Sequence, residues 1–383
     1  MLFAASCVIS AEREKFAINH GPYLQNVGEN SATIVWTTSD NAVSWVEISP
    51  DDGSHFYANE RPKYFDSPTG KKLTGKLHRI TVDNLEAGKT YNYRIFSKQV
   101  LDVGANNNVL YGTVASSRVY KAEPFKFTTL DPSKKVLKFC AVNDIHQDSD
   151  LLKRLLSKAD KDCDFIILNG DMVNSSESEE QLFSSFLDET VKSTNSSKSV
   201  YFARGNHESR GKFSERFTDF LPTPTGKPYF YIKSGPAILI FLDCGEDKPD
   251  SDIEYSDTAD FDNYRKKQAA WLKTVVVSDD FKNAKARIVI AHIPPAWGEW
   301  HGSIHFKKLF APILNGKGIS VILSGHLHKY VLFAPQPDGF DAPNVSNSNS
   351  ELVLATVDEE TVRLDFTDAD GKKAREGLTF KTR

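Results

Sequence analysis

The chain has 383 residues, of which 40% are hydrophobic and 26% are charged. This composition is that of a globular protein and excludes wholesale disorder, and the length exceeds twice the roughly 150 residues of a typical domain, which favours two domains. The formal net charge of −4 gives no support to nucleic-acid binding, because a nucleic-acid partner requires a cationic surface.

Residues 1–18 begin with an apolar stretch, LFAASCVISA after Met1, that is too short for a membrane span of about 20 residues. It is typical of the end of a secretory signal, and Cys7 after Ala-Ala-Ser resembles a lipoprotein cleavage site, although no Lys or Arg precedes it. We expect an exported protein, either periplasmic, secreted or a surface lipoprotein. A frayed N-terminus of a cytoplasmic protein is the alternative. No transmembrane segment is expected in either case.

Residues 19–131 have the pattern of short strands joined by turns, as the alternation in residues 31–38 illustrates. The arrangement Leu85-x-x-Gly88-x-x-Tyr91 resembles the tyrosine corner of a fibronectin-type sandwich, in which the tyrosine hydroxyl bonds back to the turn. We therefore expect an all-β sandwich that is fibronectin III-like. Four aromatic residues suit its core or, alternatively, a sugar-binding platform: Tyr23, Trp36, Phe56 and Tyr57.

From residue 132 to residue 383, apolar runs alternate with amphipathic helical segments, which predicts an α/β domain. We expect strands at 136–142, 164–168, 200–203, 286–291 and 319–323, helices at 149–159, 179–192 and 268–277, a hairpin at 229–243 and a closing antiparallel pair at 351–366. The first two β-α-β units require parallel strands with right-handed crossovers. We interpret the cysteines of this segment as buried, inert thiols: Cys140, Cys163 and Cys244.

Five apolar strands end in polar clusters, and these clusters carry the chemistry. Their potential metal ligands are Asp144, His146, Asp171, Asn206, His292, His326 and His328. In open α/β sheets, ligands bind beyond the carboxyl ends of the strands, so the clusters should converge. A single histidine would more often be structural, but the ordered set points to a metal site. Mixed nitrogen and oxygen ligands suit Fe, Mn or Zn, and seven ligands suit two metal ions.

The blocks Asp144-Ile-His146, Gly170-Asp171, Gly205-Asn206-His207-Glu208, His292 and Gly325-His326-Leu-His328 resemble the calcineurin-like metallophosphoesterase family over roughly residues 136–335. The N-terminal sandwich, which opens Gly21-Pro-Tyr-Leu-Gln, resembles that of the purple acid phosphatases in particular. The resemblance implies a catalytic domain of four layers, with two mixed sheets between helices. It also implies that Asp144, His146 and His328 bind one metal, that Asn206, His292 and His326 bind the other, and that Asp171 bridges both.

The resemblance to the purple enzymes is incomplete. They carry a metal-binding tyrosine three residues after the bridging aspartate, where this chain has Asn174, and they lack a histidine at the position of His146. We therefore expect two divalent ions and no ferric tyrosinate. Asn174 is interpreted as a plain turn residue, although Asn174-Ser-Ser also has the form of a glycosylation site.

The expected reaction is in-line attack of metal-bound hydroxide on phosphorus. His207 adjoins a ligand and is the candidate that protonates the leaving alkoxide or binds the transition state. Glu208 is expected to orient or charge His207, and a solvated strand-end acid is the alternative. Further candidates for substrate contact are Arg204, His301 and His305, together with Arg210, Trp297 and Trp300. Their alternatives are salt bridges for the arginines and a packed lid for the loop that contains the others.

The sequence thus predicts a dinuclear metal-dependent hydrolase of small phosphoric esters, most simply a phosphomonoesterase similar to acid phosphatases. A phosphodiesterase or nucleotidase with the same metal site is one alternative. A glycan-binding or protein-binding protein with an idle site is the other, but a site without function would be expected to lose at least one of seven ligands. The oligomeric state is not predicted.

Overall fold

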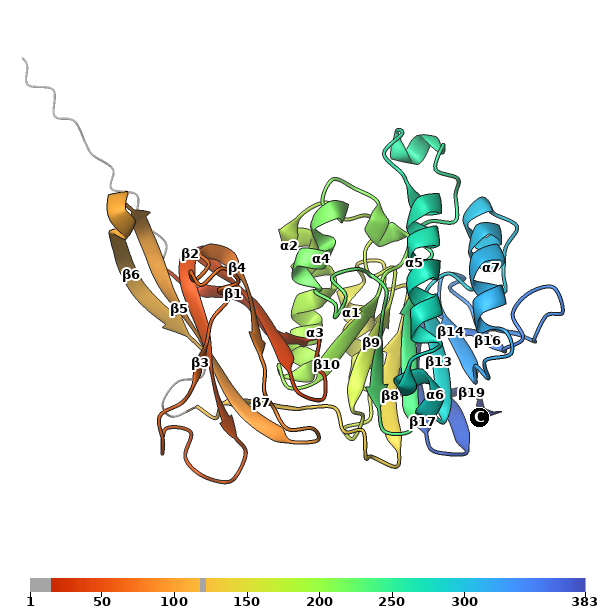
Figure 1. Ribbon diagram of the computed structural model, residues 1–383, viewed down its shortest axis with the longest axis horizontal. Coiled ribbons are helices and arrows are strands. Elements are labelled where there is room, and N and C mark those ends of the chain that lie inside the picture. The colour runs from red at the N-terminus through yellow and green to blue at the C-terminus, as the bar shows by residue number, and fades with distance from the viewer. Residues whose placement is uncertain (1–14, 118–121, 383) are drawn as a thin grey trace, which may run out of the picture.

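The computed structural model describes residues 15–117 and 122–382. Figure 1 shows two parts side by side, a β-rich part formed by the N-terminal third of the chain and a larger part in which helices cover β-sheets. The expected signal or lipoprotein segment falls largely on residues 1–14, which lie outside the described residues.

The N-terminal part is built from seven strands. They are β1 (Ile18–Gln25), β2 (Ala32–Pro50), β3 (Lys63–Tyr64), β4 (Gly75–Val82), β5 (Thr90–Val103), β6 (Val109–Ser116) and β7 (Phe125–Thr128). The long strands β2 and β5 pair with each other, and the remaining strands pair with one of these two. As the sequence predicted, the described residues of this part contain no α-helix, only a single 3₁₀ turn, η1 (Ala105–Asn107).

The tyrosine-corner contact is present, because the hydroxyl of Tyr91 accepts the backbone N–H of Glu86 at 2.9 Å. Tyr23, Trp36 and Phe56 are each 5% exposed or less, so they offer no face to a sugar and pack in the interior instead. Of the four aromatic residues considered for a sugar platform, Tyr57 alone is exposed, at 42%.

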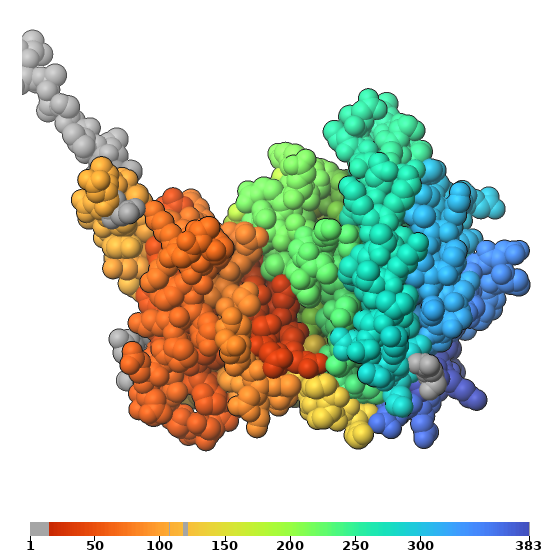
Figure 2. Space-filling view, viewed as in Figure 1, coloured from red at the N-terminus to blue at the C-terminus, as the bar shows by residue number. Residues whose placement is uncertain are grey.

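The β-rich part is joined to the α/β part by buried side-chain hydrogen bonds. The hydroxyl of Tyr23 on β1 donates to the carbonyl of Phe220, and that of Tyr201 donates to the carbonyl of Val27. The hydroxyl of Tyr93 donates to the carbonyl of Ser196 in the same way. In Figure 2 the red surface of β1 lies directly against the green surface of the α/β part. Tyr93 also belongs to the core of the β-rich part, whereas Tyr23 packs in a cluster with residues of the α/β part.

The α/β part contains two mixed six-stranded sheets. The first has the order β10-β9-β8-β17-β18-β19, with β8 (Leu137–Val142), β9 (Phe165–Asn169), β10 (Ser199–Ala203), β17 (Glu351–Val357), β18 (Thr361–Asp368) and β19 (Lys373–Lys381). The second has the order β11-β12-β13-β14-β16-β15, with β11 (Phe230–Ser234), β12 (Ala237–Leu242), β13 (Ala286–Ala291), β14 (Val321–Ser324), β15 (Val331–Phe333) and β16 (Asn344–Ser346). The expected parallel pairing of β8, β9 and β10 is confirmed.

Alternate residues of these strands face different cores. Phe139 and Ile288 belong to a cluster between the two sheets, whereas Cys140 and Val289 face helices. The helices are α1 (Ser149–Leu156), α2 (Glu179–Leu182), α3 (Asp188–Thr194), α4 (Phe217–Phe220), α5 (Phe261–Val275), α6 (Asp279–Asn283) and α7 (His301–Leu314). Short turns complete them: η2, a π-helical stretch between α2 and α3 (Phe183–Leu187), and the 3₁₀ turns η3 (His207–Ser209), η4 (Ser214–Arg216) and η5 (Ile253–Tyr255). Both faces of most strands are therefore buried, as their apolar runs predicted.

The structure differs in part from the expected loop that contains Trp297, Trp300, His301 and His305, because the last two of these residues lie in a helix. Helix α7 begins at His301, directly after the extended residue Trp300, and buries Phe306, Phe310 and Leu314 on one face. Their spacing is the helical period, which the short aromatic stretch before them masks in the sequence. Among the described residues, no helix has the length and apolar character needed to cross a membrane.

Candidate metal centre

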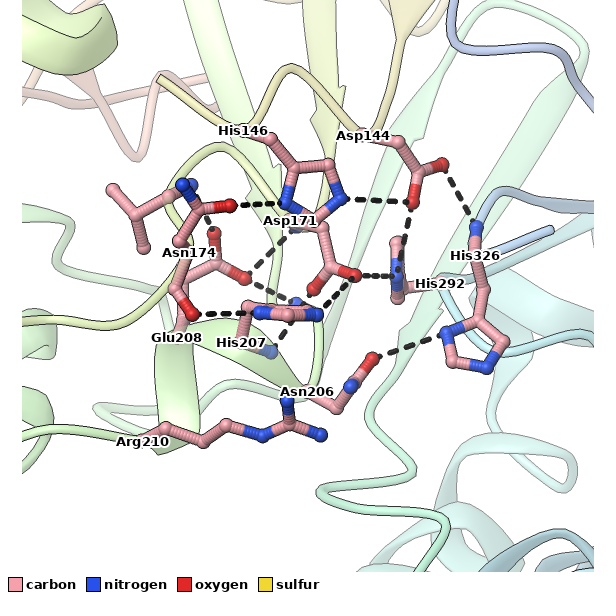
Figure 3. A network of polar contacts seen from close by, with 12 residues as sticks. Asp144, His146, Asp171, Asn174, Asn206, His207, Glu208, Arg210, His292 and His326 are labelled. Atoms are coloured by element: carbon pink, nitrogen blue, oxygen red, sulfur yellow. Dashed lines mark hydrogen bonds and ion pairs between the residues drawn. The ribbon is translucent and has the colours of Figure 1, made fainter. Parts of the chain in front are cut away.

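All seven expected metal ligands lie at the carboxyl ends of parallel strands from both sheets. Asp144 and His146 follow β8, Asp171 follows β9 and Asn206 follows β10, whereas His292 follows β13 and His326 and His328 follow β14. Figure 3 shows the side chains of the first and second groups pointing toward one another. The two groups are tied together by the backbone N–H of His326, which donates to Asp144 Oδ2 at 2.8 Å. The structure therefore brings the expected set together.

The backbone around these side chains is unusual. Five of the expected ligands have a positive φ, between 48° and 68°, namely Asp144, His146, Asp171, His326 and His328. The left-handed region costs a non-glycine residue free energy and is concentrated at functional sites. After β8, β9 and β14 the chain thus reverses sharply and turns the polar side chains into the site.

Glycines precede three of the ligands because the backbone segments approach closely. A Cβ atom on Gly205 would lie 2.1 Å from Asp171 Oδ1, and one on Gly325 would lie 2.7 Å from Asp144 Oδ2. A Cβ atom on Gly170 would lie 2.5 Å from Nδ1 of His292. The Gly-Asp, Gly-Asn-His-Glu and Gly-His-x-His blocks therefore require glycine at these positions, because any side chain there would collide with a neighbouring residue of the site.

Three imidazoles from both groups surround a buried carboxylate oxygen, Oδ1 of Asp144. Asp144 Oδ1 lies 3.4 Å from Nε2 of His328, 3.7 Å from Nε2 of His292 and 3.9 Å from Nε2 of His146. It accepts no hydrogen bond within the described part of the chain. A buried acceptor without a donor is costly, whereas a cation held by Asp144, His146 and His328 would use this oxygen as a ligand.

A second set of contacts joins Asp171 and Asn206 to His292 and His326. Nδ1 of His292 donates to the carbonyl of Asn169 at 2.7 Å, so a neutral His292 turns the lone pair of Nε2 toward Asp171 Oδ2, 2.9 Å away. Nδ1 of His326 lies 3.1 Å from Asn206 Oδ1. The lone pair of His292 Nε2 and the oxygen of Asp171 are two acceptors that require a proton or a positive ion between them.

The electrostatics of the cluster also favour a cation. Burial by itself would lower the pKa of His292, but the charges of Asp171 and Asp144 outweigh burial and raise that pKa above its usual value. Without a metal the cluster therefore holds a proton on His292, and a metal ion would take its place. At His146, burial is the dominant cause and lowers the pKa, which keeps the imidazole neutral as a metal ligand requires. The residues thus fit the metal ions that were expected.

His207 and Glu208 have different surroundings. Nδ1 of His207 donates to the carbonyl of Asn174 at 2.6 Å, and Nε2 lies 3.9 Å from Asp171 Oδ2, so the ring reaches the site. Glu208 is fully buried, which excludes the solvated acid considered from the sequence. Its carboxylate accepts the backbone N–H groups of Asp171, Met172 and Gly205 at 3.0, 2.7 and 2.8 Å. Glu208 holds two site turns together and makes no described contact with the His207 ring.

The contacts of two residues near the ligands escaped the sequence analysis. Asp247 Oδ2 lies 3.4 Å from Nε2 of His326, on the far side of the ring from Asn206. Asn174, interpreted as a plain turn residue, contacts both His146 and His207. Neither residue belongs to a cluster that follows a strand directly, so the sequence offers no signal beyond the position of Asn174 three residues after Asp171.

Of the candidates for substrate contact, Trp297 lies against the cluster, with its ring 5.6 Å from that of His326, whereas the arginines and the two histidines are engaged elsewhere. Arg204 pairs with Asp243 through Nε at 2.8 Å and Nη2 at 2.7 Å, and Arg210 pairs with the buried Glu246 at 2.7 Å. Both arginines thus form the salt bridges that were the alternative. Nε2 of His301 lies 2.8 Å from Asp262 Oδ1, and Nδ1 of His305 accepts from Arg265 Nε. These two histidines lie on α7 and form a separate cluster with Asp262 and Arg265 of α5.

Comparison with known proteins identifies the class of the site. Residues 137–330, more than half of the chain, match the calcineurin-like phosphoesterase family. The chain belongs to this family. Calcineurin-like phosphoesterases are metal-dependent hydrolases of phosphoric esters, and the matched range contains all seven expected ligands. A comparison with the sequences of curated proteins finds no match.

Solved structures of similar fold include PhoD, at 12% sequence identity and a TM-score of 0.59, with 94% of this chain and 88% of that chain covered. Because 94% of this chain is covered, the likeness to PhoD includes residues of the N-terminal β-rich part. GAP50, the anchor in the inner membrane complex of Plasmodium, has 11% identity and a TM-score of 0.48 over 65% of this chain and 90% of that chain. The cold-active protein-tyrosine phosphatase of Shewanella sp. has 14% identity and a TM-score of 0.32 over 95% of this chain and 99% of that chain.

Proposed function

We propose that this calcineurin-like phosphoesterase hydrolyses small phosphoric monoesters with two divalent metal ions bound at the ends of β8, β9, β10, β13 and β14. The observation that carries the proposal is the buried Oδ1 atom of Asp144, which has three imidazole Nε2 atoms within 3.9 Å and no hydrogen-bond donor among the described residues. A buried carboxylate so placed is best explained by a cation that it shares with the imidazoles.

Two subsites divide the ligands in this proposal. Asp144, His146 and His328 would hold one ion, Asn206, His292 and His326 would hold the other, and Asp171 would lie between them. Bound ions of Fe, Mn or Zn would act as Lewis acids toward the phosphate and lower the pKa of water. Two divalent ions would bring four positive charges, and the carboxylates of Asp144 and Asp171 would offset only two of them. The loaded site would therefore stay positive and attract a phosphate dianion.

His207 is the candidate proton donor for the leaving group. Its side chain is 26% exposed, and its Nδ1 is held by the carbonyl of Asn174, which leaves Nε2 directed to the space beside Asp171. A proton on Nε2 could pass to a leaving alkoxide that is bound there. Glu208 supports this arrangement only through the backbone of the neighbouring turns.

The test compares an aryl phosphate monoester with the matching diester as substrates of the full chain after removal of metals with a chelator. Mn, Zn and Fe(II) are then added back separately, and turnover and bound metal per chain are measured. We expect metal-restored turnover that is faster for the monoester. Asp144→Asn, which keeps the size of the side chain and removes its charge, should lose both turnover and at least one ion.

The other outcomes separate the remaining hypotheses. Faster diester hydrolysis would favour a phosphodiesterase or nucleotidase with the same metal site. Binding of two ions without turnover of either ester would contradict the proposed phosphomonoesterase and favour a binding protein. Failure to bind any of the three metals would contradict the proposed metal site itself.

Three finer assignments complete the proposal. We propose that the β-rich part is fibronectin III-like, supported by the Tyr91 contact, and that the α/β part has the layer order helices, sheet, sheet, helices. We also propose export, which the apolar residues after Met1 support. Mass spectrometry of the N-terminus of the protein expressed in cells would test export, because an exported chain should lack those residues.

A further inference from the structure

Asn174 lies three residues after Asp171 and contacts two histidines of the site at once (Figure 3). Its side-chain Oδ1 is 2.9 Å from Nδ1 of His146, and its backbone carbonyl oxygen is 2.6 Å from Nδ1 of His207. The two contacts leave from different parts of the same residue. They can therefore be separated by substitution, since replacing the side chain leaves the carbonyl in place.

Both contacts determine where the imidazole protons lie. Amide and carbonyl oxygens only accept hydrogen bonds, so Nδ1 of each histidine must carry the proton. A neutral imidazole with a proton on Nδ1 has its lone pair on Nε2. Nε2 of His146 lies 3.0 Å from Nε2 of His328 and faces Asp144, so this is the tautomer that can bind a metal ion there.

A further residue fixes the direction of the Asn174 amide. Asn174 Nδ2 donates to Oε1 of Gln147 at 2.9 Å. Reversing the Asn174 amide alone would oppose its Oδ1 to the Gln147 oxygen, so the hydrogen bond to Gln147 would be lost. Gln147 has a positive φ of 69°, and its backbone N–H donates to the carbonyl of Met172 at 2.9 Å. The contact with Gln147 thus favours the orientation in which the oxygen of Asn174 faces His146.

We propose that Asn174 is a positioning residue whose side chain selects the metal-binding tautomer of His146 and whose backbone carbonyl selects the tautomer of His207. The inference deepens the proposed metal-dependent function and rests on it. Partners of metal-bound histidines generally fix ring orientation in this way, and their loss weakens metal binding. At the position where the purple enzymes bind metal through tyrosine, this chain would thus act on the metal indirectly through His146.

The test uses Asn174→Leu, which removes the acceptor at similar volume, and Asn174→Asp, which keeps an oxygen in the place of Oδ1. Ser175→Ala is the matched control, because the Ser175 hydroxyl donates to Glu177 and contacts no histidine of the site. The ring-nitrogen NMR shifts of the metal-free full chain report the tautomer of each histidine. Titration with Mn or Zn reports metal affinity.

In the native chain we expect a proton on Nδ1 of both His146 and His207. Asn174→Leu should move the His146 proton toward Nε2, leave His207 unchanged and weaken the binding of one ion by roughly 10–100-fold. Asn174→Asp should restore the native His146 signal and most of the affinity, and Ser175→Ala should match the native chain. A merely structural role of Asn174 would alter stability without this selective change at His146.

An unchanged His146 tautomer together with unchanged metal affinity in Asn174→Leu would overturn the inference. A tautomer change at both histidines would overturn the division between side chain and carbonyl. If Asn174→Leu fails to fold, Gln147→Leu replaces it, and the same loss of tautomer selection at His146 is then expected. A native chain that binds no metal would contradict the proposed function, while the metal-free NMR spectra would still decide the role of Asn174.

Discussion

The Oε2 atom of Glu208 accepts the backbone N–H of Asp171 at 3.0 Å, across 37 positions of the chain. The same carboxylate also accepts the N–H groups of Met172 and Gly205. Burial and the charge of Asp171 raise the pKa of Glu208, while these amide hydrogen bonds act in the opposite direction. The turns after β9 and β10 therefore share one buried acceptor, which fixes Asp171 relative to Asn206.

Glu208→Ala should destabilise the protein, because it leaves three buried N–H groups without an acceptor. We expect a loss of about 3 kcal/mol or more in the free energy of unfolding, measured by denaturant titration. Bound metal should fall as well, since the turn that carries Asp171 loses its support. Unchanged stability, within about 0.5 kcal/mol, with an altered pH profile of turnover would instead indicate that Glu208 acts chemically on His207.

The sequence predicted the strands and the ligand cluster because both leave local signals. Apolar runs marked β8, β9, β10 and β13, and the parallel order of such strands places their ends at one edge. The glycines beside the ligands are part of the same signal. The convergence of Asp144 with His326, 182 positions apart, follows from this topology without knowledge of any side-chain contact.

Contacts that depend on side-chain direction were not predictable in the same way. Glu208 adjoins His207 in sequence, yet its side chain points to backbone amides of another turn. Asn174 reads as a turn residue, and only the fold brings its oxygens to two histidines. The helical start at His301 was missed because the aromatic and glycine residues before it are typical of a loop.

His207→Ala should reduce turnover while sparing metal binding. Loss of a general acid typically costs about 10²–10⁴-fold in rate, and kcat should fall within this range. His207 also lies in one group with His146 and Asp171 whose ligand atoms are close enough to hold a metal ion. Metal per chain, measured alongside kcat, therefore decides the role. A loss of one ion would make His207 a ligand in place of a proton donor.

Gly205→Ala should disrupt the site without any change of charge. The added Cβ would lie 2.1 Å from Asp171 Oδ1 and 2.5 Å from the Asp171 backbone nitrogen, and neither atom is free to move because Glu208 and His207 hold them. Overpacking of this kind costs about 1–3 kcal/mol, and we also expect loss of bound metal. Gly75→Ala is the control, since its nearest new contact is at 3.9 Å. Equal metal content in the two variants would contradict the steric argument.

The contact between the β-rich part and α3 should depend on pH. Nδ1 of His20 lies 3.0 Å from Asp188 Oδ1, and this hydrogen bond, followed by the charge of Asp188, raises the pKa of His20 above 6.5 in spite of partial burial. A group whose folded-state pKa is raised stabilises the fold fully below its unfolded pKa, and the stabilisation is lost as pH rises through the folded-state value. The difference in unfolding free energy between the native chain and Asp188→Asn should therefore be largest near pH 5, at no more than about 1 kcal/mol, and should shrink toward pH 9. His20→Gln should show the same trend, because it removes the titrating ring while Asp188 remains. A difference that stays constant between pH 5 and pH 9 would show that the contact does not depend on the His20 proton.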